Sequence, residues 1–481
     1  MKEKEHTLSN LLLPYKKQKE VLSISDSSLD LGFPAVRGKE VVAGFSGDDV
    51  TSNSGVLLLG LADRRLDLIR SVATALRDRR DPRKIVHSLE SLICERVFGI
   101  GAGYEDANDL NKLRCDPALK VACGRLPGSD PALASQPTIS RLEHSANRFS
   151  LFRAAKAMAR CVVDRLPANT KEVVLDVDAT DDACYGQQQL SLFNAHYDNY
   201  CYLPLLLYIT GPDGVQRQMT AMLRDGHAHG TTGLRAMLRC AVKLIRARFP
   251  NVRIILRADS GFGCAKTIGW CHNLNIEFVL GVSGNSCLHR LSERTQIAAS
   301  IKHTMLKSWF PRITPEYDEF DYAADTWKTK ERVIVKAEVT EKKTWHPDRE
   351  IIHAKVNPRF VVTTLTNLSP RELYKFYCER GDRENRIKEF KVDLSAGRTS
   401  CTDFLANQFR LLLHTCASIL MCALQEAAAG TRLAKAQIGT LRLAIIKIGA
   451  RVTQSVRRIV FRMANSAPEQ DVWRHMYLNL T

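Results

Sequence analysis

Two aspartates follow apolar segments in the middle of the sequence. Asp178 ends the run Val-Val-Leu-Asp-Val-Asp at 173–178, and Asp259 follows Val-Arg-Ile-Ile-Leu-Arg-Ala at 252–258. Short apolar runs bounded by polar turns predict buried strands. The ligand groups of α/β sheets gather at the carboxyl ends of such strands. One aspartate at a strand end is commonly a turn residue bonded to its own backbone, but two on neighbouring strands favour a shared site.

A third carboxylate, Glu384, lies in a charged segment at 377–391. On a helix with about 100° per residue, four side chains of this segment fall on a stripe about 60° wide. They are Tyr377, Arg380, Glu384 and Lys391. The stripe forms only if the helix continues through Gly381. It is then either a solvated charged face or a surface that grips phosphate beside a metal ligand.

The three carboxylates and the surplus of positive charge together indicate a chemistry. Carboxylate oxygens are suitable ligands for Mg²⁺ or Mn²⁺. Two such ions about 4 Å apart activate a nucleophile and stabilise the leaving oxygen of a phosphoryl displacement. The net charge is +17, from 69 Lys and Arg against 52 Asp and Glu, which favours a polyanionic partner. The combination predicts phosphodiester chemistry on nucleic acid.

The composition excludes several other classes. With 481 residues and 45% apolar residues, the chain is not mainly disordered. Its longest membrane-like run, 411–425, is shorter than the roughly 20 residues that span a bilayer. The first residues lead into no apolar secretory segment, and none of the fourteen cysteines forms a Cys-x-x-Cys pair. We therefore expect a cytoplasmic protein with reduced thiols and no zinc finger.

The elements that must position the carboxylates change type along the chain. Residues 56–165 have helical periodicity, and Ser135 and Pro137 suit a helix start; either a helix-turn-helix or plain bundle packing explains this pattern. After 167, three hairpin-like strands precede alternating helix and strand, which predicts an α/β fold with a mixed sheet. Residues 286–358 interrupt it with short β-type runs. The α/β pattern resumes at 359, followed by a long helical region.

The spacing Tyr-x2-Arg-x3-Glu-x6-Lys at 377–391 resembles the signature of DDE transposases of bacterial insertion sequences. Further segments resemble the 1380 family of insertion sequences: 175–182, 257–262, 398–401, 406–413 and 447–451. The resemblance extends over nearly the whole chain. It implies a ribonuclease-H-like catalytic domain in which a mainly β insertion separates the second aspartate from the glutamate.

The resemblance also implies roles for individual residues. Asp178, Asp259 and Glu384 would form the catalytic triad and hold two Mg²⁺ or Mn²⁺ ions. Tyr377, Arg380 and Lys391 would bind the phosphates of the transposon ends. Asp176 shares a side of its strand with Asp178, because side chains alternate with period two. The family pattern favours Asp178, which stands just before an x-Thr pair.

Five segments are expected from the pattern and the resemblance together. They are a polar N-terminal arm (1–55), a helical DNA-binding or dimerisation domain (56–165), the catalytic domain (166–285 and 359–430), the β insertion (286–358) and a basic helical C-terminal tail (431–481).

Two further groups of residues have less specific signals. His227 and His229 lie in a Gly-rich loop, where they are expected to be exposed and not to bind a hard cation that prefers oxygen. Three tryptophans of the insertion are candidates for stacking on a flipped base, or else pack in its core. They are Trp309, Trp327 and Trp345.

The implied protein binds the terminal inverted repeats of an insertion sequence, cleaves the ends and joins the freed 3′-OH to target DNA. Two ends imply a homodimer in the active complex, associated with the bacterial nucleoid and without a membrane partner. Two alternatives remain open. One is a metal-dependent nuclease without strand transfer, against which the Tyr-Arg-Glu-Lys stripe argues. The other is a catalytically silent DNA-binding protein, against which the three carboxylates argue.

Overall fold

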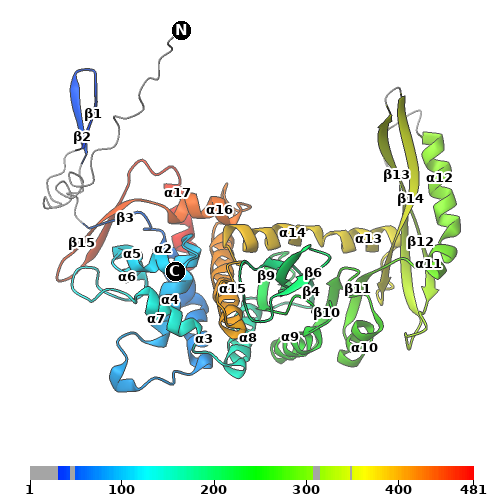
Figure 1. Cartoon of the computed structure of the whole chain (residues 1–481), viewed down its shortest axis with the longest axis horizontal. Helices are drawn as coiled ribbons and strands as arrows, with labels where there is room; N and C mark the ends of the chain where they lie inside the picture. The colour runs from blue at the N-terminus through cyan, green and yellow to red at the C-terminus, as the bar shows by residue number, and fades with distance from the viewer. Residues whose placement is uncertain (1–30, 44–48, 307–314, 347–348) are drawn as a thin grey trace, which may run out of the picture.

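The computed structural model describes residues 31–43, 49–306, 315–346 and 349–481, with the backbone alone at 31–36, 40–43, 306, 342–346, 349–353 and 382–384 (Figure 1). A helical body, a central sheet and a projecting arm follow one another along the longest axis (Figure 1).

The helical body contains seven of the described helices, as the apolar periodicity predicts. They are α2 (Val56–Leu66), α3 (Leu68–Leu76), α4 (Leu89–Gly101), α5 (Leu110–Leu113), α6 (Pro117–Ala122), α7 (Gln136–Glu143) and α8 (Arg148–Val163). The side chain of Ser88 caps α4, and Asn147 and Ser150 form a reciprocal capping box at the start of α8. Such caps satisfy amide groups that the first helical turn leaves without partners.

The central sheet is mixed and has eight strands, in the order β12-β13-β14-β11-β10-β4-β8-β9. β4 (Glu172–Ala179) lies parallel to β10 (Arg253–Ala258), which lies parallel to β11 (Glu277–Val282). β8 (Leu205–Thr210) and β9 (Gln216–Met222) continue from β4 in antiparallel fashion. The helix α9 (Leu234–Arg248) leads from β9 into β10, and α10 (Ala265–Leu274) connects β10 with β11. The predicted α/β fold with a mixed sheet is confirmed.

The predicted insertion forms an outer arm that continues this sheet. It contains α11 (Ser286–Leu291), α12 (Glu293–Leu306), β12 (Glu316–Tyr322), β13 (Glu331–His346) and β14 (Arg349–Thr363). β14 pairs antiparallel with β11 from Val279↔Thr363 to Val282↔Phe360. The strand predicted to begin at 359 is therefore the last third of β14, and the strand pairing continues from the central sheet into the arm (Figure 1).

The prediction of one straight helix over 377–391 is wrong in two places. α13 (Pro370–Cys378) and α14 (Gly381–Lys388) are separated at Glu379 and Arg380. Both residues keep right-handed dihedral angles, so the two helices follow one another closely (Figure 1). A π-helical turn, Glu389–Asp393, then replaces the last α-helical turn. A π turn contains more residues than an α turn, so Lys391 does not keep its predicted angle.

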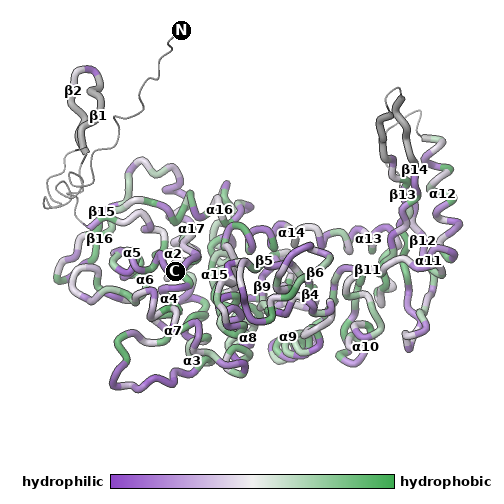
Figure 2. The backbone as a smooth tube through the Cα atoms, in the orientation of Figure 1, coloured by the Kyte–Doolittle hydropathy of each residue, from purple (hydrophilic) through white to green (hydrophobic). Residues whose placement is uncertain are grey.

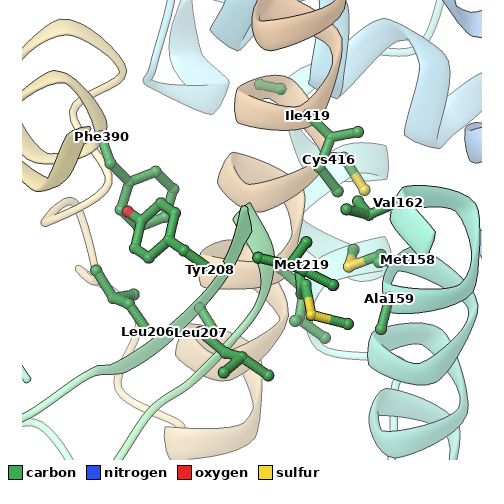
Figure 3. Close-up of a cluster of buried hydrophobic side chains, with 14 of the residues drawn as sticks. Met158, Ala159, Val162, Leu206, Leu207, Tyr208, Met219, Phe390, Cys416 and Ile419 are labelled. Carbon is green, nitrogen blue, oxygen red and sulfur yellow. The ribbon is translucent and has the colours of Figure 1, made fainter. Parts of the chain in front are cut away.

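The long helix α15 (Phe404–Ala427) joins the helical body to the sheet. It packs against β9 on the sheet side and against α2, α4 and α8 of the helical body. Figure 3 shows apolar side chains of α8, β9 and α15 meeting in one cluster: Met158, Ala159, Val162, Met219, Cys416 and Ile419. The helical and α/β parts of the chain therefore share one hydrophobic core.

The predicted helical tail is wrong for residues 450–463. β15 (Ala450–Gln454) and β16 (Ile459–Met463) form a hairpin, and β15 also pairs with β3 (Val50–Thr51). Burial alternates at the start of β15, as expected of a strand with one face against the body. The other C-terminal elements are helical: α16 (Ile438–Leu441), a π turn (Arg442–Ile446) and α17 (Gln470–Leu480).

The predicted polar arm is only partly described. Residues 1–30 and 44–48 lie outside the described residues, while β1 (Leu31–Val36) and β2 (Lys39–Ala43) pair as a hairpin. Thr51, Asn53 and Ser54, which precede the predicted boundary at 55, are buried. Within the described part of the chain, no helix is long and apolar enough to cross a membrane.

Candidate active site

The two predicted aspartates lie at the carboxyl ends of adjacent parallel strands. β4 and β10 are in register as far as Val177↔Ala258, so Asp178 and Asp259 follow at the same edge of the sheet. The side chain of Asp178 is 14% exposed and that of Asp259 is 37% exposed. Asp259 Oδ1 accepts a hydrogen bond from the Gly261 amide at 2.9 Å, which fixes the carboxylate in a tight turn. Both carboxylates remain accessible at this edge.

Arg380 brings the two carboxylates to one point. Its Nη1 atom lies 3.9 Å from Asp178 Oδ2 and 3.7 Å from Asp259 Oδ2. The guanidinium carbon stands 5.5 Å from the ring centre of Tyr377. The break between α13 and α14 therefore directs this arginine at the strand ends. The positive charge of Arg380 offsets the repulsion between the carboxylates of Asp178 and Asp259.

Asp176 has a different environment from Asp178. It is fully buried, and Arg257 donates to its two oxygens at 2.8 and 3.1 Å. Arg257 also donates to the Phe376 carbonyl at 2.6 Å, and Gln216 donates to Asp176 at 3.1 Å. This ion pair connects β4, β9, β10 and α13 beneath the accessible edge. Asp178, two residues further on, is the aspartate that meets Asp259 at Arg380.

Lys391 forms its ion pair with a different acid, Asp181. Its Nζ atom lies 2.8 Å from Asp181 Oδ1, in the loop after β4. The π turn accounts for this displacement from the predicted stripe. The sequence analysis assigned no role to Asp181, although its position three residues after Asp178 was a usable signal.

Asp182 is a buried acid next to this ion pair. The Thr399 hydroxyl donates to its Oδ2 atom at 2.6 Å. Burial raises the pKa of Asp182 from its ordinary value of 3.8 to about 7, although the hydrogen bond from Thr399 opposes the shift. The side chain therefore holds a proton in the folded state at mildly acidic pH, which limits the negative charge beside Asp181.

We expect Asp182→Asn to weaken the pH dependence of stability. An acid with a raised folded-state pKa stabilises the protein fully below its unfolded-state pKa, and this contribution is lost as pH rises to about 7. The free energy of unfolding should thus fall between about pH 4 and 7 in the wild type, by at most about 1.4 kcal/mol per pH unit from this group. Denaturant titrations of both proteins across this range measure the difference. Equal slopes would contradict the assignment.

The third predicted carboxylate is placed through its backbone. Glu384 lies in α14, one turn after Arg380, and its side chain is outside the described ones. Among the described side chains, no group of three or more His, Cys, Asp or Glu could hold a metal ion. Asp178 and Asp259 nevertheless offer oxygen ligands at one point, which fits a hard divalent cation.

A hollow of about 350 Å³ opens beside Asp259. It lies between the end of β10, β11, β14 and α13, and it holds two arginines and two tyrosines. Its lining residues include Ser260, Gly281, Arg359, Tyr374, Tyr377 and Arg380. Arginines next to aromatic rings suit the phosphates and bases of a nucleic acid.

The remaining candidates are placed elsewhere. His227 Nε2 lies 2.9 Å from the Phe193 carbonyl, and His229 Nδ1 lies 3.2 Å from the Thr231 hydroxyl. Trp327 packs against Tyr322, with ring centres 5.4 Å apart, at the edge of the hydrophobic core. Trp309 lies outside the described residues, as does the side chain of Trp345.

A family model described as transposase DDE domain group 1 matches residues 33–481. The match includes the helical body, the central sheet, the outer arm and the C-terminal hairpin. No curated protein matches the chain.

Proposed function

Since the chain belongs to the group 1 DDE transposases, whose members are DNA-cleaving enzymes that use divalent metal ions, we propose that it is the transposase of an insertion sequence of the 1380 family. It would bind the terminal inverted repeats, cleave the ends and join the 3′-OH to target DNA. The strand order and the mixed pairing around β4 support a ribonuclease-H-like catalytic domain.

The convergence of Asp178 and Asp259 on Arg380 carries this proposal. Asp178, Asp259 and Glu384 are assigned to two Mg²⁺ or Mn²⁺ ions. Such ions activate the attacking water or hydroxyl and stabilise the leaving oxygen. The protein's own contribution is to hold carboxylate oxygens at one edge of a rigid sheet.

The cationic side chains hold the DNA against these carboxylates. Arg380, whose Nη1 atom lies within 4 Å of both aspartates, would pair with the phosphate under attack. Tyr377 supports the guanidinium from one side. Lys391, held by Asp181, adds a second cation further along the same helical segment. Because two DNA ends must be processed together, the active complex is proposed to contain two copies of the chain.

A transposition assay tests the function as a whole. A marker flanked by the inverted repeats that border the gene is supplied in one plasmid, and the protein in another. Excision with integration elsewhere is the expected result. Cleavage without integration would instead identify a nuclease, and binding without cleavage would identify a silent DNA-binding protein.

We expect Gly281→Ala to impair cleavage. A β-carbon on Gly281 would lie 2.6 Å from Tyr377 Oη and 2.8 Å from the Ser260 amide, so the strand end and the tyrosine must separate. A misplacement of about 1 Å near reacting groups costs roughly 100-fold in rate. DNA cleavage by the purified variant measures the reduction.

Two variants control for this effect. Gly269→Ala lies in α10, where the new β-carbon meets nothing within 4 Å, and should cleave normally. Tyr377→Phe combined with Gly281→Ala removes the closest atom and should restore part of the cleavage rate. Normal cleavage by Gly281→Ala itself would show that the position of Tyr377 is unimportant.

A further inference from the structure

A basic corner stands at the far side of the helical body from the outer arm. We define it as the loop 77–88 between α3 and α4, the helix α7, and the first turns of α8. A hollow of about 310 Å³ lies between these parts and is lined by Arg77, Arg79, Arg80, Thr138, Arg141 and Asn147, among others. The loop projects at the lower left of Figure 1, and most of it is coloured as hydrophilic in Figure 2.

The charges of the loop are unevenly matched. It contains five cations, Arg77, Arg79, Arg80, Arg83 and Lys84, and two acids, Asp78 and Asp81. Both acids are engaged within the loop: Asp78 pairs with Arg80 at 2.6 Å, and Asp81 accepts from the Arg83 amide at 3.1 Å. Within the described part of the chain, the other four cations form no ion pair with an acid. Arg141 of α7 and Arg148 of α8 add two more positive charges to the corner.

Two large aromatic rings are exposed at the start of α8, between Arg148 and Arg153 in the sequence. Phe149 is 77% exposed and Phe152 is 53% exposed, three residues apart on α8. The opposite face of α8 supplies the core through Leu151, Ala154 and Met158, so the two rings contribute little to folding. Because residues three positions apart lie on one side of a helix, the two phenylalanines form a small exposed apolar patch.

The rings are held on a rigid support. The capping box of Asn147 and Ser150 fixes the start of α8. Arg153 Nε donates to the Ala75 carbonyl at 2.9 Å, which ties α8 to the end of α3 where the basic loop begins. The start of α8 is therefore fixed against the end of α3, where the basic loop begins.

We propose that the basic corner binds duplex DNA at the ends of the element and bends it. Its arginines would contact phosphates, and Phe149 and Phe152 would insert between bases that unstack where the duplex bends. Apolar wedges flanked by basic residues are a known means of kinking a duplex. The large excess of cations favours DNA over an apolar protein partner. This proposal rests on the proposed function and assigns it a second DNA-binding surface outside the active site.

The first experiment measures the electrostatic contribution of the arginines to DNA binding. Full-length protein is titrated with a fluorescent duplex carrying the terminal repeat, at several salt concentrations. Arg79→Ala with Arg141→Ala should lower the slope of log K against log salt by about 0.9 for each DNA phosphate that the variant no longer neutralises. The control is Arg235→Ala with Arg239→Ala, two exposed arginines of α9 with the same change of charge. Equal reductions in both pairs would overturn the proposal, because binding would then depend only on net charge.

The second experiment tests whether the phenylalanines unstack bases, using duplexes with 2-aminopurine at successive positions. Wild-type protein should raise the 2-aminopurine fluorescence at one base step. Phe149→Ala and Phe152→Ala should each weaken binding by about 5- to 150-fold, abolish the rise and leave the salt slope unchanged. Leu478→Ala, an exposed apolar side chain of α17, should do neither.

The outcomes separate the two proposals. If the wild type itself fails to bind the repeat, the proposed function fails. If the wild type binds and the phenylalanine variants bind equally well, only the basic corner is refuted. If these variants instead change the size of the protein in solution and not its DNA affinity, the rings belong to a protein interface and the DNA proposal is wrong.

Discussion

Asp259→Asn is expected to abolish DNA cleavage while the protein still folds and binds DNA. The amide keeps the shape of the side chain and can still accept the Gly261 hydrogen bond, so the turn after β10 is preserved. It removes one charged ligand of the proposed metal site. Since bound metal contributes several kcal/mol to the transition state of phosphoryl transfer, cleavage should fall by roughly a thousandfold or more.

The measurement is Mg²⁺-dependent nicking of a labelled duplex with the terminal repeat, alongside its binding. Asp106→Asn is the matched control, because Asp106 also accepts a bond from the amide two residues on but lies in the helical body. Asp178→Asn should behave like Asp259→Asn. Normal nicking by either variant would remove that residue from the proposed triad.

Arg257→Met is expected to cause a large loss of stability. The change leaves Asp176 fully buried without the guanidinium that now bonds both its oxygens. Breaking a buried ion pair on one side costs about 3–5 kcal/mol, because the remaining charge is uncompensated. The bond from Arg257 to the Phe376 carbonyl is removed as well, so α13 should detach locally from the sheet.

Denaturant unfolding of the purified variant measures this loss. Arg253→Met, on the same strand, is the control: its ion pairs with Glu172 and Glu277 are more exposed and should be worth less than about 1 kcal/mol. Asp176→Leu combined with Arg257→Met should recover most of the stability, because neither charge is then buried alone. If Arg257→Met lowers the free energy of unfolding no more than Arg253→Met does, the ion pair of Asp176 with Arg257 has no structural importance.

The strand-end aspartates could be predicted from the sequence because their signal is local. Asp178 and Asp259 each end an apolar run, and parallel strands place such ends together. The choice of Asp178 over Asp176 needed the family pattern, since both lie on one side of the strand. The burial of Asp176 with Arg257 depends on packing between four elements, which residue spacing alone does not predict.

The arrangement of the helical segment 377–391 was predicted less accurately than the strand ends. Angles of 100° per residue assume one regular helix, while the structure has a break at Arg380 and a π turn around Lys391. Neither deviation follows from residue spacing, and the π turn accompanies an ion pair of Lys391 with Asp181, 210 residues away in sequence. The C-terminal hairpin was missed for a similar reason, because its partner β3 is about 400 residues away in sequence.

The pairing of β14 with β11 has a consequence for shortened forms of the protein. β11 carries Gly281 next to the candidate active site, and β14 satisfies its outer amides and carbonyls. Deleting the segment from β12 to β14 would turn β11 into an unprotected edge strand, which invites pairing with other chains and aggregation. Removing the outer arm should therefore expose an edge of the central sheet, because β14 covers the outer side of β11.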